Sequence, residues 1–152
     1  MDTRSIKKIL VATDFSEPSV AAVAAAIEFA RVFQAAIEIV HVYVDPVYVL
    51  PPPVDLATFP FDMASVLVKV QAHLDDERAR VQAAGVPCEA VALSGKPAPE
   101  IVARAKAIGA DIIVMGRHGR GGLEHALLGS VAERVVHHTS CPVLVVPTER
   151  KT

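Results

Sequence analysis

The residues best suited to chemistry lie in a glycine-rich segment in the last third of the sequence. Gly116, Gly119 and Gly129 are spaced along it, and Ser130 directly follows the last of them. Glycines allow backbone N–H groups to approach phosphate oxygens without an intervening side chain. A helix beginning at Ser130 would add free N–H groups and the positive end of its dipole. The spacing therefore predicts a site for a phosphorylated ligand.

Charged side chains accompany these glycines. The guanidinium of Arg117 or Arg120 can bind phosphate oxygens, or it can stay solvated in the loop, and His118 has the same two alternatives. For Ser130 the alternative is a capping box with Glu133, in which the hydroxyl serves only the helix. The two roles are compatible, because a capping serine still presents its backbone N–H to a phosphate.

Two common phosphate-binding motifs are absent from the sequence. It contains no G-x-x-x-x-G-K-[ST] loop, and no G-x-G-x-x-G follows the first apolar run. These absences disfavour a P-loop NTPase and a standard dinucleotide dehydrogenase.

Apolar runs and helical patterns alternate along the chain, and they must position the glycine segment. This alternation predicts a single α/β domain over residues 1–152, with a doubly wound sheet of five parallel strands and helices on both faces. Its strand order is expected to be Rossmann-like or flavodoxin-like. The predicted strands are 6–13, 37–44, 86–93, 111–115 and 142–146, and the predicted helices are 16–34, 66–84, 99–108 and 130–138.

The segment 45–62 departs from this pattern. It contains five prolines with aromatic and aliphatic side chains between them. A connector of this length and apolar character is more than a simple loop. We expect an extended flap packed on its own domain, a lid over a ligand or a subunit contact.

The last predicted strand has proline at both ends and four aliphatic residues between them. In a monomer it would be an exposed hydrophobic edge, and such edges favour pairing with another chain. We therefore expect a homodimer formed through Pro142–Pro147.

Composition and charge argue against several classes of function. The net charge is −2, with 15 basic and 17 acidic residues, so no electropositive face for nucleic acid is expected. No apolar stretch reaches the roughly 20 residues of a membrane span, and the first residues lack a signal-peptide core. The prediction is a cytoplasmic protein. Cys88 and Cys141 lack metal-type spacing and are expected to be reduced packing residues.

The glycine spacing also resembles a known signature. Gly116, two residues, Gly119, nine residues and then Gly129-Ser130 are similar to the G-x2-G-x9-G-[ST] pattern of the ATP-binding branch of the universal stress protein family. Further motifs that resemble this family occur in the family's order at 8–16, 40–42, 110–116 and 140–146. The segment 45–62 follows no motif of the family.

The resemblance implies which residues surround an adenine nucleotide. Its nucleoside end is implied to contact residues that end three of the predicted strands, with Asp14 near the ribose and the backbone around Val42 at the adenine. The implied nucleoside contacts are Ala12, Thr13, Asp14, Val42, Met115 and Gly116. The implied phosphate contacts are Gly119, Gly129, Ser130 and Val131, with Arg117 and His118 as further candidates.

The resulting interpretation is an ATP-binding, nucleotide-dependent regulatory module of the stress response with little or no turnover. ADP and AMP are alternative ligands, and magnesium is expected with the phosphates, with Asp14 as a candidate ligand. A slow ATP hydrolase is a second hypothesis, although hydrolysis also requires a positioned water and a cation, and no lysine occurs between Ala107 and Arg150. A nucleotide-independent dimeric scaffold is a third hypothesis, and a flavin or NAD carrier is a fourth.

Overall fold

The computed structural model describes residues 5–45, 62–119 and 127–148. Strands and helices alternate strictly within these ranges, as the sequence predicts. In chain order they are β1 (Lys8–Ala12), α1 (Glu17–Phe33), β2 (Ala36–Tyr43), α2 (Met63–Ala83), β3 (Cys88–Ser94), α3 (Pro97–Ile108), β4 (Ile112–Gly116), α4 (Ser130–His138) and β5 (Val143–Val146).

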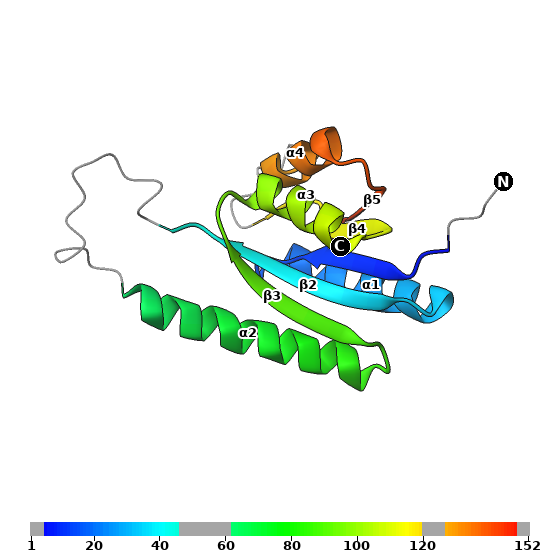
Figure 1. The fold of residues 1–152 in the computed structure, drawn as a ribbon, viewed down its shortest axis with the longest axis horizontal. Helices are drawn as coiled ribbons and strands as arrows, with labels where there is room; N and C mark the ends of the chain where they lie inside the picture. The colour runs from blue at the N-terminus through cyan, green and yellow to red at the C-terminus, as the bar shows by residue number, and fades with distance from the viewer. Residues whose placement is uncertain (1–4, 46–61, 120–126, 149–152) are drawn as a thin grey trace.

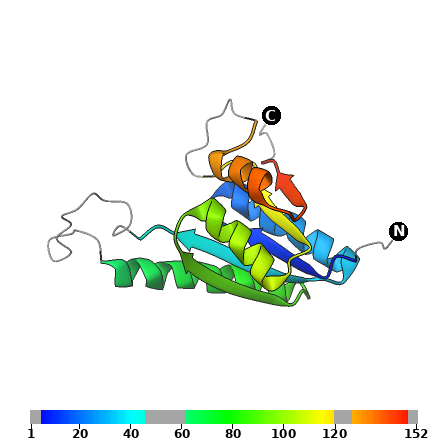
Figure 2. The same ribbon diagram turned by 45° about the horizontal axis from the view of Figure 1, so that its top comes forward.

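The strands form a five-stranded sheet in the order β3-β2-β1-β4-β5, and every neighbouring pair is parallel. Helices α1 and α2 cover one face, and α3 and α4 cover the other (Figures 1 and 2). The predicted doubly wound α/β sheet is therefore confirmed, and its order is Rossmann-like rather than flavodoxin-like. The order reverses between β1 and β4, which creates a switch point at their carboxyl ends.

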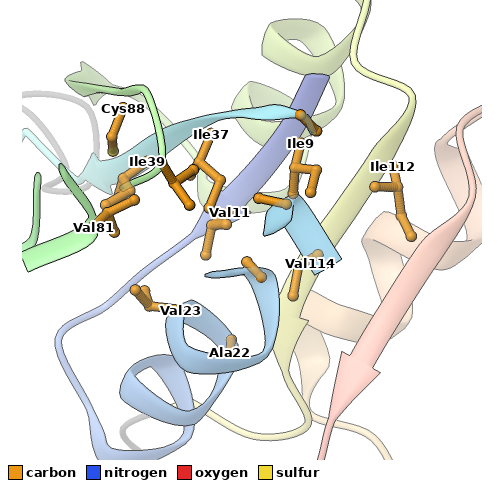
Figure 3. Close-up of a cluster of buried hydrophobic side chains, with 14 of the residues drawn as sticks. Ile9, Val11, Ala22, Val23, Ile37, Ile39, Val81, Cys88, Ile112 and Val114 are labelled. Carbon is orange, nitrogen blue, oxygen red and sulfur yellow. The ribbon is translucent and has the colours of Figure 1, made fainter. Parts of the chain in front are cut away.

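The central strands are buried on both faces, which explains their uninterrupted apolar sequence. Alternate residues of β1 point in opposite directions: Ile9 and Val11 pack against α1 and α2, whereas Leu10 packs against α3 and α4. Figure 3 shows the first of these clusters, in which side chains of β1, β2, β3 and β4 lie together with Ala22 and Val23 of α1. Two apolar layers thus fix the sheet between its helices.

Two helices begin earlier than predicted. Helix α2 begins at Met63 because the Asp62 side chain caps it and accepts a hydrogen bond from the Ala64 N–H at 3.1 Å. Helix α3 begins at Pro97, since proline fits the first turn of a helix. Its predicted end is confirmed, with Gly109 at a φ of 65°.

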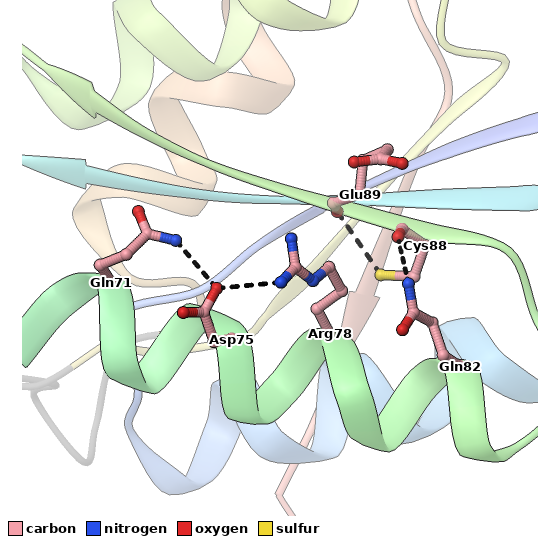
Figure 4. A network of polar contacts seen from close by, with 6 residues as sticks. All are labelled: Gln71, Asp75, Arg78, Gln82, Cys88 and Glu89. Atoms are coloured by element: carbon pink, nitrogen blue, oxygen red, sulfur yellow. Dashed lines mark hydrogen bonds and ion pairs between the residues drawn. The ribbon is translucent and has the colours of Figure 1, made fainter.

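A polar contact also fastens α2 to the edge strand β3, since the Gln82 amide donates to the Cys88 carbonyl at 3.1 Å. Within α2, Asp75 accepts from Gln71 and pairs with Arg78 (Figure 4). Burial raises the pKa of the Cys88 thiol to about 12. Both cysteines are free, which confirms that prediction.

Among the helices that the structure describes, none has the length and apolar character required to cross a membrane. The proline-rich stretch 46–61 lies outside the described residues, so the three interpretations of segment 45–62 remain predictions.

Candidate functional site

A pocket of about 540 Å³ opens at the carboxyl ends of β1 and β4. This is the position of the switch point, where ligands bind in open α/β sheets. Residues that follow β1 and β4 form one side, and the first turns of α3 and α4 form the other. A volume of this size suits a small organic ligand.

The residues that the sequence analysis singled out come together here. Every one of the implied nucleoside and phosphate contacts lines this pocket: Ala12, Thr13, Asp14, Val42, Met115, Gly116, Arg117, His118, Gly119, Gly129, Ser130 and Val131. Their role as nucleotide contacts remains a prediction. Arg120 lies outside the described residues.

The sequence analysis missed several lining residues. They are Ser19, Val40, Pro97, Ile101, Leu128, Ala132 and Glu133. A signal existed for Pro97 and Ile101, because the start of a helix that follows a parallel strand lies at the carboxyl edge of the sheet. No comparable signal existed for Ser19, which enters the site through its contact with Asp14.

The turn after β1 holds the Asp14 carboxylate in place. Its Oδ1 atom accepts from the Ser16 N–H at 3.0 Å, from the Ser16 hydroxyl and from the Ser19 hydroxyl at 2.7 Å. The Ser19 oxygen in turn accepts from the Asp14 N–H at 3.0 Å. This aspartate is therefore oriented before any ligand arrives. A carboxylate in this position can accept hydrogen bonds from sugar hydroxyls.

Phe15, the next residue, has a left-handed backbone with a φ of 63°. For a bulky side chain this conformation costs about 1 to 3 kcal/mol, and such residues cluster at functional sites. The Phe15 N–H donates to the Thr13 hydroxyl at 3.1 Å, and its ring packs on His41 with centroids 4.5 Å apart. Local contacts thus hold the strained turn.

The glycine loop, which approaches Asp14, depends on missing side chains. A Cβ on Gly119 would lie 2.7 Å from Asp14 Oδ2, and one on Gly129 would lie 3.2 Å from the Arg117 carbonyl oxygen. Gly116 has a different constraint, because a Cβ there would meet the Pro18 backbone at 2.9 Å. Gly119 and Gly129 therefore keep the loop close to the site, whereas Gly116 allows α1 to pack on β4.

Helix α4 directs its N-terminus into the pocket. Gly129 is its N-cap, so Ser130 is the first helical residue and no side chain caps the helix. The capping box of Ser130 with Glu133 is therefore wrong as an explanation of this serine. The Arg117 Nε–H donates to the Leu127 carbonyl at 2.8 Å, so this arginine braces the loop.

The lining combines apolar side chains with polar groups. The apolar lining residues include Val40, Val42, Pro97, Ile101, Met115, Leu128 and Ala132. The polar groups include Asp14, Ser19, Ser130 and the backbone of the glycine loop. Within the described ranges no three acidic, histidine or cysteine side chains come together as a metal site. The pocket can bury a flat apolar group and also bind an anion.

Comparison with known proteins agrees with this arrangement. The sequence profile described as "Universal stress protein family" matches residues 5–147. Universal stress protein MJ0531 of Methanocaldococcus jannaschii is 40% identical over 148 residues, which cover 95% of this chain and 84% of that protein.

Solved structures give the same result. The structure of MJ0577, a Methanocaldococcus jannaschii protein, superimposes with a TM-score of 0.83 at 29% identity and covers 97% of this chain and 99% of its own. A universal stress protein solved in complex with cAMP superimposes with a TM-score of 0.71 at 27% identity, covering 95% and 99% of the two chains.

Proposed function

The chain belongs to the universal stress protein family, and on that premise we propose that it binds an adenine nucleotide in the pocket at the switch point. ATP is the first candidate, with ADP and AMP as alternatives. The protein acts as a cytoplasmic, nucleotide-dependent regulatory module of the stress response with little or no turnover. A relative with the same fold binds cAMP, which supports an adenine ligand.

One observation carries this proposal: an apolar wall and a helix N-terminus face the same pocket, with Asp14 between them. Adenine packs against Val42 and Ile101, the ribose hydroxyls donate to Asp14, and the phosphates accept from N–H groups of the glycine loop and α4. Micromolar affinity requires about −8 kcal/mol, and a helix dipole supplies only about 0.3 to 2 kcal/mol. Adenine burial and several hydrogen bonds must therefore act together.

Magnesium, in this proposal, reaches the site bound to the phosphates. Mg²⁺ in nucleotide sites keeps several waters and uses one or two carboxylates. Asp14 and Glu133 are the acidic residues that line the described pocket. Because three donors already occupy Asp14 Oδ1, we expect only a small protein contribution to the coordination.

Calorimetric titration of nucleotide-stripped protein with Mg-ATP, Mg-ADP, AMP and cAMP tests the proposal. Gly119→Leu is the blocking variant, because its side chain would occupy the space beside Asp14. Ala72→Leu adds the same bulk at an exposed position of α2, outside the pocket, and is the matched control. Saturable binding by the wild type and Ala72→Leu, lost in a folded Gly119→Leu, supports the proposal. An absence of binding to the wild type rejects it and favours a nucleotide-independent scaffold.

The same titration samples separate binding from hydrolysis. Phosphate release by the wild type, measured at saturating Mg-ATP against the Gly119→Leu variant, is expected to equal the variant's background. Turnover above that background would instead make the protein a slow ATP hydrolase.

We also propose homodimerisation through the Pro142–Pro147 edge. Strand β5 lies at the end of the sheet. The carbonyls of Pro142 and Val146 accept from β4, so by alternation the backbone groups of Val143 and Val145 point away from β4. These outward groups are available for pairing with a second copy.

A single substitution tests this edge. Val145→Pro removes an outward N–H, and proline is tolerated on an edge strand whose N–H faces away from the sheet. Val145→Ala keeps that N–H and is the control. Sedimentation should show monomer for the proline variant and dimer for the alanine variant. A dimeric proline variant would place the interface elsewhere. Lysines at Leu144 and Val146 would be a poorer test, because both side chains pack against the core.

A further inference from the structure

Helix α2 contributes no described residue to the lining of the pocket, yet one of its side chains reaches the site from behind. Glu77 projects from the middle of α2 and is only 7% exposed. The Thr13 hydroxyl, itself on a residue 6% exposed, donates to Glu77 Oε1 at 3.4 Å. A buried carboxyl thus touches Thr13, which directly follows β1 and lines the pocket.

The contact continues from Thr13 into the strained turn. The same hydroxyl that donates to Glu77 accepts from the Phe15 N–H at 3.1 Å. The Thr13 carbonyl accepts from His41 Nδ1 at 2.8 Å, so that nitrogen bears the proton. In the sequence, Asp14 lies between Thr13 and Phe15, which these hydrogen bonds hold in place. Its carboxylate therefore depends on a chain of contacts that starts at Glu77.

Several charged or titratable groups surround the Glu77 carboxyl. Burial raises its pKa above the ordinary glutamate range, and the charge of Asp14 raises it further. The Thr13 hydrogen bond and the Arg80 charge oppose this shift. From β2, His41 faces the same space, and His73 of α2 packs its ring on Phe15 at 4.9 Å. Among the described residues, Glu77 Oε2 has no hydrogen-bond partner.

We propose that Glu77 is a positioning residue for the nucleotide site: through the Thr13 hydroxyl it fixes the turn that presents Asp14, and its protonation is coupled to nucleotide affinity. This inference rests on the proposed function. When Glu77 ionises, it places a second negative charge behind Asp14 and an anionic ligand. Affinity therefore falls as the pH rises through the titration of Glu77, and protonated Glu77 is the binding-competent form.

The link itself can be measured without nucleotide. Amide NMR of Phe15 is followed over a pH series that starts at the ordinary glutamate pKa of about 4.3 and extends upward, because burial raises the pKa of Glu77. In the wild type we expect a transition that Glu77→Gln and Thr13→Val both remove. An identical Phe15 profile in the wild type and Glu77→Gln overturns the inference, whatever the protein binds.

The coupling is measured by titrating Mg-ATP over the same pH range. Glu77→Gln mimics the protonated carboxyl and still accepts from Thr13, so its affinity should stay at the wild-type low-pH value. The ratio of the two dissociation constants should grow about threefold or more toward high pH, since one pKa unit of coupling equals tenfold. Asp76→Asn changes the same charge at an exposed neighbour and should follow the wild type.

The outcomes distinguish this inference from the proposed function. If the dissociation constants of the wild type and Glu77→Gln for Mg-ATP change with pH in the same way, Glu77 has only a packing role, and its proposed positioning role is overturned. Failure of the folded wild type to bind nucleotide would reject the proposed function and the coupling. In that case the Phe15 titration still decides whether Glu77 controls the turn.

Discussion

The Asp14 turn (the Asp14 end) and the glycine loop (the glycine end) meet at the pocket and are built in opposite ways. At the Asp14 end, Ser16 of the turn and Ser19 of α1 donate to one carboxylate, and Glu77 supports the turn from behind. At the glycine end, the described loop approaches the site because side chains are missing, and the backbone bond from Gly129 N–H to the Arg117 carbonyl, 2.7 Å long, closes it. The Asp14 end is held by side-chain hydrogen bonds, and the glycine end depends on the absence of side chains at Gly119 and Gly129.

The difference corresponds to two kinds of recognition. A ribose presents hydroxyl groups in fixed directions, so a carboxylate oriented in advance can distinguish it. Phosphates are charged and rotate freely, so several N–H groups at a helix N-terminus bind them without a dedicated side chain. We therefore expect substitutions at the two ends to have different effects on nucleosides and on nucleotides.

The largest effect is expected at Gly116, which lines the pocket and also has backbone packed directly against it. Gly116→Val would drive a Cβ into the Pro18 backbone, which cannot move without shifting α1. Overpacking of this kind costs about 3 kcal/mol, at the upper end of its usual range. Thermal unfolding should show a clear drop in Tm.

Gly119→Ala is the matched comparison, because its Cβ meets only the Asp14 carboxylate tip. It should keep a nearly wild-type Tm and lose nucleotide affinity. Equal melting of the wild type and Gly116→Val would show that α1 does not depend on this glycine. It would also restore Gly116 as a residue kept for the ligand.

The next effect concerns the Asp14 end. Asp14→Asn removes the charge that the ribose hydroxyls contact in the proposed complex, and hydrogen bonds to charged groups contribute about 1.5 to 3 kcal/mol. Affinity for adenosine and for Mg-ATP should both fall by about 10- to 100-fold. Calorimetry with both ligands measures this. A loss confined to Mg-ATP would mean that Asp14 acts on the phosphates through magnesium.

A smaller effect is expected at the other end. Ser130→Ala removes a hydroxyl but keeps the backbone N–H, and a single neutral hydrogen bond contributes about 0.5 to 1.5 kcal/mol. Affinity for Mg-ATP should fall about 2- to 10-fold, while adenosine binding stays unchanged. Ser140→Ala, at an exposed position outside the pocket, is the control. Weaker adenosine binding in Ser130→Ala would contradict the division between the two ends.

The sequence predicted one end of the pocket better than the other. The glycines and Ser130 follow a spacing that can be recognised in a line of sequence, and Asp14 follows an apolar strand, so all of them were found. Ser19 and Glu77 were not found, because they lie on α1 and α2 and come near the site only when these helices pack on the sheet. Even the strand order required the structure, since alternation of elements is equally compatible with two orders.

The role of Gly116 shows a second limit. Its position in the glycine signature predicts a contact with the ligand, which stays a prediction, and the structure shows a second constraint because the Pro18 backbone lies where a Cβ would be. Sequence spacing indicates that a side chain is excluded but not what excludes it. The packing of α1 against β4, two elements far apart in the sequence, shows that the Pro18 backbone excludes a side chain at Gly116.

The smallest expected effect concerns the support behind the Asp14 end. The pKa of Glu77 is raised in the folded protein, so its contribution to stability is complete below the unfolded value of about 4.3 and is lost as the pH rises through the folded value. Glu77→Gln has no such loss. Its free energy of unfolding relative to the wild type should therefore increase as the pH rises from the unfolded pKa through the folded pKa of Glu77, with about 1.4 kcal/mol corresponding to one pKa unit.

Urea denaturation across this range, with Asp76→Asn as the control, measures that difference. Thr13 and Arg80 offset part of the burial, so we expect a small value. A difference that decreases with pH would mean that Glu77 is held ionised in the fold. Both Asp14 and Glu77 would then be negatively charged, and the anionic nucleotide would bind despite repulsion from both carboxylates.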